Sequence, residues 1–220
     1  MKIACLQFNP IQENTYVVWD DTLEAVVIDA GNSNPREDAA LDNFIAEHGL
    51  RPVLAANTHG HFDHTLGVAH LKKRYGIPFA MSLKDAFLLD NASTSGSIFG
   101  VPVGEMPSVD TDLDTTPEIR FGHTVLRVIH TPGHTPGSVV LLCGEYLFCG
   151  DTLFAGSIGR TDLEGGSSAQ MAESLRKLAK LPIPRGTQVL PGHGEFSTFG
   201  DELDNNYFIR SAVRGNNDLF

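Results

Sequence analysis

The sequence has few cysteines and no long hydrophobic run, and each absence excludes a class of protein. The three cysteines, Cys5, Cys143 and Cys149, are too few for a disulfide framework, and their odd number suits free thiols in a reducing compartment. No apolar run approaches the roughly 20 residues of a membrane-spanning helix. The N-terminal residues contain no apolar signal-peptide core. We therefore expect a cytoplasmic protein with no membrane partner.

Positive charge is also scarce, because 16 lysines and arginines stand against 27 acidic residues, a formal net charge of -11. Nucleic-acid binding needs clustered basic residues, so this balance argues against a nucleic-acid partner. It does not exclude a small anionic substrate, because bound divalent metals reverse the local sign of charge. With 220 residues, of which 41% are hydrophobic, we expect one globular domain over residues 1–220.

One short stretch carries most of the metal-binding side chains, and its sequence is Thr58-His59-Gly60-His61-Phe62-Asp63-His64. An apolar strand is expected just before it, over 52–57, and helical spacing of apolar residues is found just after it, over 68–75. The carboxyl ends of such strands are where ligands bind in open α/β sheets. Imidazole and carboxylate ligands suit zinc, iron or manganese.

The spacing within this stretch indicates two metals. Residues i and i+2 of an extended segment point to one face, so His59 and His61 can bind one ion. Asp63 and His64 would turn away at the start of the helix and meet a second ion. Three more candidate ligands lie in glycine-containing turns after expected strands: His134 in TPGHTPGS, Asp151 in CGDT and His193 in PGHG.

The order of expected elements repeats in the two halves of the chain. Strands are predicted over 2–8, 14–19 and 24–30, with a helix from Asn34 to Gly49, and the second half has strands over 119–149 and 187–190. A final helix is predicted from about Phe199 to Ala212. This is a mixed α/β (α+β) pattern, and it suggests a four-layer αββα sandwich of two mixed sheets flanked by helices. Residues 91–118 lack periodicity, which indicates a lid or a pocket wall.

The HxHxDH stretch, followed by His134, Asp151 and His193 in that order, resembles the metallo-β-lactamase superfamily, and within it the short bacterial relatives of glyoxalase II (hydroxyacylglutathione hydrolase). The superfamily's αββα fold agrees with the order of elements. The resemblance implies two metals, most simply zinc, with iron or manganese as alternatives. It assigns metal one to His59, His61 and His134, metal two to Asp63, His64 and His193, and a bridging role to Asp151.

The resemblance also implies a reaction. A water between two cations is acidified to a pKa of about 7 or below, and the resulting hydroxide attacks a carbonyl group that a metal polarises. Asp63 and Asp151 are then the catalytic carboxylates. A thioester such as S-lactoylglutathione, or a related acyl thiol, fits this chemistry because its thiolate leaving group needs little help from a general acid.

Glyoxalase II proper has a C-terminal helical domain that binds glutathione, and we expect that domain to be absent here. The loop over 156–162 is the best remaining candidate for a substrate contact, through Arg160, which can also pair with Asp162 or Asp151. This Gly-Arg-Thr-Asp stretch also resembles that of persulfide dioxygenases, which would use His59, His134 and Asp151 on one iron. A lactonase or an RNA-processing nuclease is a further alternative, and the oligomeric state is left open.

Overall fold

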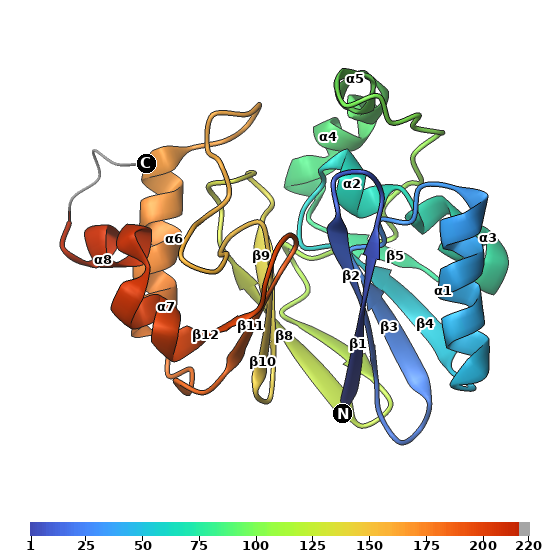
Figure 1. Ribbon diagram of the computed structural model, residues 1–220, viewed down its shortest axis with the longest axis horizontal. Coiled ribbons are helices and arrows are strands. Elements are labelled where there is room, and N and C mark those ends of the chain that lie inside the picture. The colour runs from blue at the N-terminus through green and yellow to red at the C-terminus, as the bar shows by residue number, and fades with distance from the viewer. Residues whose placement is uncertain (216–220) are drawn as a thin grey trace.

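The computed structural model describes residues 1–215, and it consists of two six-stranded sheets (Figure 1). The first sheet has the order β1 (Lys2–Phe8), β2 (Glu13–Trp19), β3 (Glu24–Ile28), β4 (Arg51–Ala56), β5 (Phe79–Met81) and β6 (Thr111–Asp112). Its β1–β2 and β2–β3 pairs are antiparallel, whereas β3–β4, β4–β5 and β5–β6 are parallel. The sheet is therefore mixed, as the sequence predicted.

The second sheet has the order β12 (Ser197–Thr198), β11 (Gln188–Pro191), β10 (Tyr146–Gly150), β9 (Val139–Cys143), β8 (Thr124–His130) and β7 (Glu118–Phe121). Only β10 and β11 pair in parallel, and every other neighbouring pair is antiparallel. This sheet is also mixed, and it comes almost entirely from the second half of the chain.

Helices cover the outer face of each sheet. Figure 1 shows α1 (Pro35–Glu47) and α3 (Val68–Tyr75) beside the first sheet. On the opposite side of the molecule, α6 (Ser168–Lys180), α7 (Phe199–Asn205) and α8 (Tyr207–Val213) lie beside the second sheet. The shorter α2 (Phe62–Thr65), η1 (Leu83–Asp85), α4 (Ala86–Asp90) and α5 (Ala92–Ile98) follow the strands of the first sheet. The predicted αββα sandwich is confirmed.

Strand alternation explains why four layers form. In β2, Tyr16 and Val18 belong to a buried cluster between the sheets, together with Phe148 and Leu141 of the second sheet. The intervening Val17 packs instead against the cluster beneath α1 and α3. Successive side chains of a strand point to opposite faces, so a strand that is apolar on both faces must be covered on both. A third buried cluster joins the second sheet to α6, α7 and α8.

Two expectations about local structure are wrong. The final helix is broken at Asn206, whose backbone is extended and whose side chain accepts hydrogen bonds from the Phe208 and Ile209 amides, so that it caps a new helix. Residues 91–118 are not wholly irregular, because they contain α5 and β6. The sequence does not predict α5, because this helix is short and buries only Ala92 and Gly96, which give no apolar stripe.

Within residues 1–215, no helix combines the length and the apolar character that crossing a bilayer requires.

Candidate metal centre

The loops that carry the seven predicted ligands all follow the carboxyl ends of strands. The HxHxDH stretch follows β4, the His134 loop joins β8 to β9, Asp151 follows β10, and His193 follows β11. Since β4 belongs to the first sheet and the other three strands to the second, the candidate centre lies where the two sheets meet at one edge of the sandwich. The structure brings all seven side chains together there.

One group of three imidazoles corresponds to the predicted first metal. The ligand atoms of His59, His61 and His134 all lie within 4.8 Å of one another. His61 Nδ1 is 3.1 Å from His59 Nε2 and 2.9 Å from His134 Nε2. Three imidazole nitrogens that converge on one point form a nitrogen donor set suited to zinc or iron.

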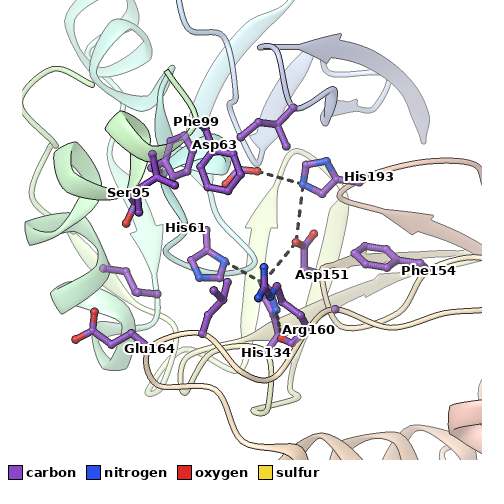
Figure 2. Close-up of a pocket in the computed structure, with 16 residues that line it drawn as sticks. His61, Asp63, Ser95, Phe99, His134, Asp151, Phe154, Arg160, Glu164 and His193 are labelled. Atoms are coloured by element: carbon purple, nitrogen blue, oxygen red, sulfur yellow. Dashed lines mark hydrogen bonds and ion pairs between the residues drawn. The ribbon is translucent and has the colours of Figure 1, made fainter. Parts of the chain in front are cut away.

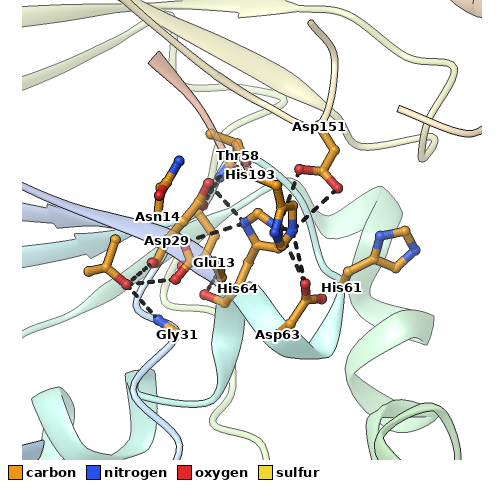
Figure 3. Close-up of polar contacts among 12 residues, drawn as sticks. Glu13, Asn14, Asp29, Gly31, Thr58, His61, Asp63, His64, Asp151 and His193 are labelled. Atoms are coloured by element: carbon orange, nitrogen blue, oxygen red, sulfur yellow. Dashed lines mark hydrogen bonds and ion pairs between the residues drawn. The ribbon is translucent and has the colours of Figure 1, made fainter. Parts of the chain in front are cut away.

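A second group corresponds to the predicted second metal, and the ligand atoms of Asp63, His64 and His193 also lie within 4.8 Å of one another. Asp63 Oδ2 is 3.2 Å from His193 Nε2, and the Nε2 atoms of His64 and His193 are 3.2 Å apart (Figure 3). This group has one carboxylate and two imidazoles, so it differs from the first in charge.

Asp151 lies between the two groups. Its Oδ2 is 3.4 Å from His134 Nε2, and its Oδ1 is 3.4 Å from His64 Nε2 (Figure 2 shows it between His134 and His193). Oδ1 is buried and finds no hydrogen-bond partner anywhere in the described chain. A buried carboxylate oxygen without a partner is costly unless a cation completes it. The donor set and this unpartnered oxygen fit divalent metal ions, which these residues would hold.

Hydrogen bonds behind the ligands fix the imidazole tautomers. Thr58 Oγ1 donates to Asp29 at 2.7 Å, so it accepts from His59 Nδ1 at 3.1 Å and leaves Nε2 free to face the cluster. His134 Nδ1 donates to the carbonyl oxygen of Arg160 at 2.7 Å, with the same result. Asp29 Oδ2 also lies 3.2 Å from His64 Nδ1. Such outer partners orient metal ligands and raise their basicity.

Asp29 is close enough to His59 and His64 to form a third group of possible ligand atoms. Both of its oxygens are already engaged, because they accept from the Thr58 amide and the Thr58 hydroxyl at 2.7 Å. We therefore assign Asp29 to support of the ligands rather than to a third metal.

The electrostatics of the cluster suit cation binding. Burial lowers the pKa of His61 to about 4 and that of His59 well below its usual value, so both imidazoles are neutral near pH 7. Burial opposes protonation of His64, but the carboxylates of Asp63 and Asp151 outweigh burial and raise the pKa of His64. The second group therefore attracts a positive charge, and a metal ion bound there would displace the proton of His64, since metals bind the neutral imidazole.

Asp85 is a supporting residue that the sequence did not reveal. It is fully buried, and its carboxylate accepts from the Gly60 amide at 2.9 Å, the Thr135 hydroxyl at 2.6 Å and the Gly137 amide at 2.6 Å. Gly60 lies between His59 and His61, and Thr135 follows His134. One carboxylate thus joins the two loops that supply the first group.

The start of β2 is a second unrecognised support, on the side of His193 and His64 (Figure 3). Asn14 Nδ2 donates to the carbonyl oxygens of Pro191 and Gly194 at 3.1 Å, on either side of His193. The fully buried Glu13 places Oε1 3.8 Å from His64 Nδ1, and burial raises the pKa of Glu13 well above its usual range. The sequence does contain one signal for this support: a glutamate at the start of an apolar strand, with no lysine or arginine near it in the sequence.

Two glycines near the ligands cannot carry a side chain. A Cβ at Gly192 would lie 2.4 Å from Asp151 Oδ1 and 2.5 Å from His64 Cε1, inside contact distance. Gly150 has a φ of 47°, and a Cβ there would lie 2.1 Å from Thr58 Oγ1. The turns that aim Asp151 and His193 therefore depend on close backbone approach.

A pocket of about 490 Å³ opens over the cluster (Figure 2), and His61, Asp63, His134, Asp151 and His193 form part of its lining. Ser95, Ile98 and Phe99, from the segment 91–118, also line it. The loop that follows Asp151 forms a second lip of the pocket, where Arg160, Leu163 and Glu164 line it, and Figure 2 shows Arg160 beside His134. Its guanidinium pairs in bidentate fashion with Asp162, at 2.7 and 2.8 Å, so of the two predicted partners the structure selects Asp162.

Comparison with known families agrees with this geometry. The model of the metallo-beta-lactamase superfamily matches residues 8–193, which include every candidate ligand. The chain belongs to the metallo-β-lactamase superfamily. Membership accounts for the αββα sandwich and for the position of the metal-binding cluster at the edge where the two sheets meet.

Individual superfamily members are similar over nearly the whole chain. A hydroxyacylglutathione hydrolase, GloC of Haemophilus influenzae, is 32% identical over 96% of this chain and 99% of its own. The crystal structure of BLEG-1 B3 metallo-beta-lactamase is 35% identical, with a TM-score of 0.86 over 94% of this chain and 99% of that one. TTHA1623, solved in a di-iron-bound form, is 33% identical, with a TM-score of 0.82 over 93% of this chain and 99% of its own.

Proposed function

We propose that this superfamily member is a binuclear metal-dependent hydrolase of thioesters. The observation that carries the proposal is the position of Asp151, whose two oxygens lie 3.4 Å from an imidazole of each ligand group at the pocket lining. The divalent ions would be held by His59, His61 and His134, by Asp63, His64 and His193, and by Asp151 between them. Zinc is the simplest choice, and iron is supported by the di-iron form of TTHA1623.

Bound metals would supply Lewis acidity, which polarises a carbonyl group and acidifies water. The protein's own part is to hold the donors still. Asp63 is fixed from behind, since Asn9 Nδ2 donates to its carbonyl oxygen at 3.0 Å, and its carboxylate faces the pocket. In this proposal Asp63 and Asp151 are the catalytic carboxylates, and Asp63 would also orient the attacking water.

The pocket lining offers few proton donors for a leaving group. Apart from the ligands, the ionisable groups on its lining are Arg160 and Glu164, and Arg160 is already paired with Asp162. A thiolate leaves with little protonation because thiols have a pKa near 8.5, whereas an amine leaving group needs a proton donor. The similarity to GloC supports the same reaction class.

A mononuclear iron persulfide dioxygenase is the second candidate, since His59, His134 and Asp151 alone could hold one iron. The intact second group of Asp63, His64 and His193, with all ligand atoms within 4.8 Å, favours two metals. A nuclease is disfavoured by the net charge of -11. A lactonase would use the same metal ligands, and assays with a lactone and a thioester distinguish the two activities.

The test is a substrate panel on metal-loaded protein: S-lactoylglutathione, the uncharged thioester S-acetyl-N-acetylcysteamine, a β-lactam, a lactone and glutathione persulfide. We expect kcat/KM of about 10⁴ M⁻¹s⁻¹ or more on at least one thioester, lost on chelation and restored by metal. The β-lactam serves as a control with an amine leaving group. Faster turnover of the β-lactam or lactone, or oxygen consumption with the persulfide alone, would contradict the proposal.

A further inference from the structure

The mouth of the pocket is lined by apolar side chains that are open to solvent. Ile98 and Phe99, at the end of α5, are 78% and 58% exposed. Leu163, in the loop that carries Arg160, is 38% exposed. All three line the pocket above the ligand cluster. Large apolar side chains that are exposed together at a pocket mouth mark a surface that a ligand covers.

Buried side chains hold this apolar wall in place. Beneath Phe99 lies Phe62 of α2, whose ring centroid is 5.7 Å away, and Phe62 is buried in a cluster with Ala92 and Val101. Because Phe62 stands between His61 and Asp63 in the chain, the apolar wall continues directly into the metal ligands. The position of α5 is therefore tied to the ligand loop through a packed aromatic contact.

Contacts join the two lips of the pocket, which are α4–α5 on one side and the loop that carries Arg160 on the other. Asn91, at the start of α5, donates a hydrogen bond to Glu164 at 3.3 Å, and Gly165 lies close to Phe87 of α4, since a Cβ on Gly165 would be 2.9 Å from its ring. The pocket volume of about 490 Å³ falls within the usual range of small-molecule sites, about 300–1,000 Å³. A chain of several carbons fits between these lips.

Beyond the metal ligands, the pocket lining carries little positive charge. Among the residues that line it, Arg160 is the one lysine or arginine, and its Nε and Nη2 donate to the two carboxylate oxygens of Asp162. Glu164 adds negative charge to the same lip. The thiol part of a glutathione thioester carries free carboxylates, whereas the one lysine or arginine on the lining is already paired with Asp162.

We propose that the natural substrate is an uncharged thioester carrying an apolar chain of about four to eight carbons, seated on Ile98, Phe99 and Leu163. This inference rests on the proposed thioesterase function and narrows it. The chain can belong to the acyl part or to the thiol part, because both flank the carbonyl group.

The experiment measures kcat/KM of metal-loaded protein on acetyl, butanoyl and hexanoyl thioesters of N-acetylcysteamine, on the hexanethiol ester of acetic acid, and on S-lactoylglutathione. We expect an increase of about threefold per methylene in the series that fills the pocket, and a higher value for its longest member than for S-lactoylglutathione. The acyl and thiol series identify which part of the substrate is apolar.

Matched variants locate the effect. In Ile98→Ser/Phe99→Ser, the ratio of long-chain to acetyl kcat/KM should fall about tenfold, with circular dichroism checking the fold. Val213→Ser, which changes an equally exposed apolar residue on α8 (57% exposed), should leave that ratio unchanged. A flat chain-length series or a preference for S-lactoylglutathione would overturn the inference and leave the thioesterase proposal standing. Failure to hydrolyse any thioester would overturn both.

Discussion

Asp151→Ala is expected to lower kcat/KM for thioester hydrolysis by about a thousandfold and to release at least one metal per chain. The reason is the position of the side chain, whose two oxygens each lie 3.4 Å from an imidazole of a different ligand group. Lewis-acid stabilisation is worth several kcal/mol, and each 1.36 kcal/mol corresponds to a factor of ten in rate. Steady-state kinetics and metal analysis of the purified variant measure the two effects.

A structural role for Asp151 would give a different result. Its carboxylate also lies 3.4 Å from His64 and from His134, so metal-free wild type and metal-free variant each serve as the reference for their own metal-loaded form. The rise in Tm on adding metal should be lost, because that rise comes from binding to the folded state. Asp21→Ala removes the same charge from an exposed turn and should change neither property. An Asp151→Ala protein that keeps two metals and full rate would refute the bridging assignment.

Asp85→Asn is expected to destabilise the protein by about 2–4 kcal/mol and to weaken metal binding at His59, His61 and His134. The buried carboxylate accepts from three donors, the amides of Gly60 and Gly137 and the Thr135 hydroxyl. An asparagine amide would turn its NH₂ group toward at least one of these donors and leave a buried donor unsatisfied. For a chain of this size, Tm should fall by roughly 5–15 °C.

The matched control is Asp90→Asn, which makes the same change at an exposed position five residues along the chain. It should leave Tm and metal affinity at wild-type values. Metal affinity of Asp85→Asn, measured by competition with a chromophoric chelator, should fall about 10- to 100-fold, as for other losses of outer support. If Asp85→Asn lowered Tm but bound both metals with wild-type affinity, Asp85 would be a purely structural residue.

The ligands could be predicted from the sequence because their signal is local. His59, His61, Asp63 and His64 fall within six positions, and the three later ligands each lie in a short glycine-containing turn. Asp85 gave no such signal. Its partners are 25, 50 and 52 residues away, and only the fold brings them together. In the sequence it is simply an acid near the start of a helix.

The fold could also be predicted from local patterns in the sequence, whereas the break in the final helix could not. The strands that are apolar on both faces, such as β2, required layers on both sides, which the four-layer sandwich supplies. The break at Asn206 depends on a side chain that caps α8 and also donates to Glu202 and Ser157. The latter contact is 49 residues away, so no local pattern could indicate it.

Metal content tests most directly whether two metals share this site. Protein purified without added metal, and then loaded and desalted, is analysed for zinc, iron and manganese by inductively coupled plasma mass spectrometry. We expect a total near two equivalents per chain, falling to about one in His193→Ala. A total near one equivalent of iron in the loaded wild type, unchanged by His193→Ala, would contradict it and favour the mononuclear dioxygenase.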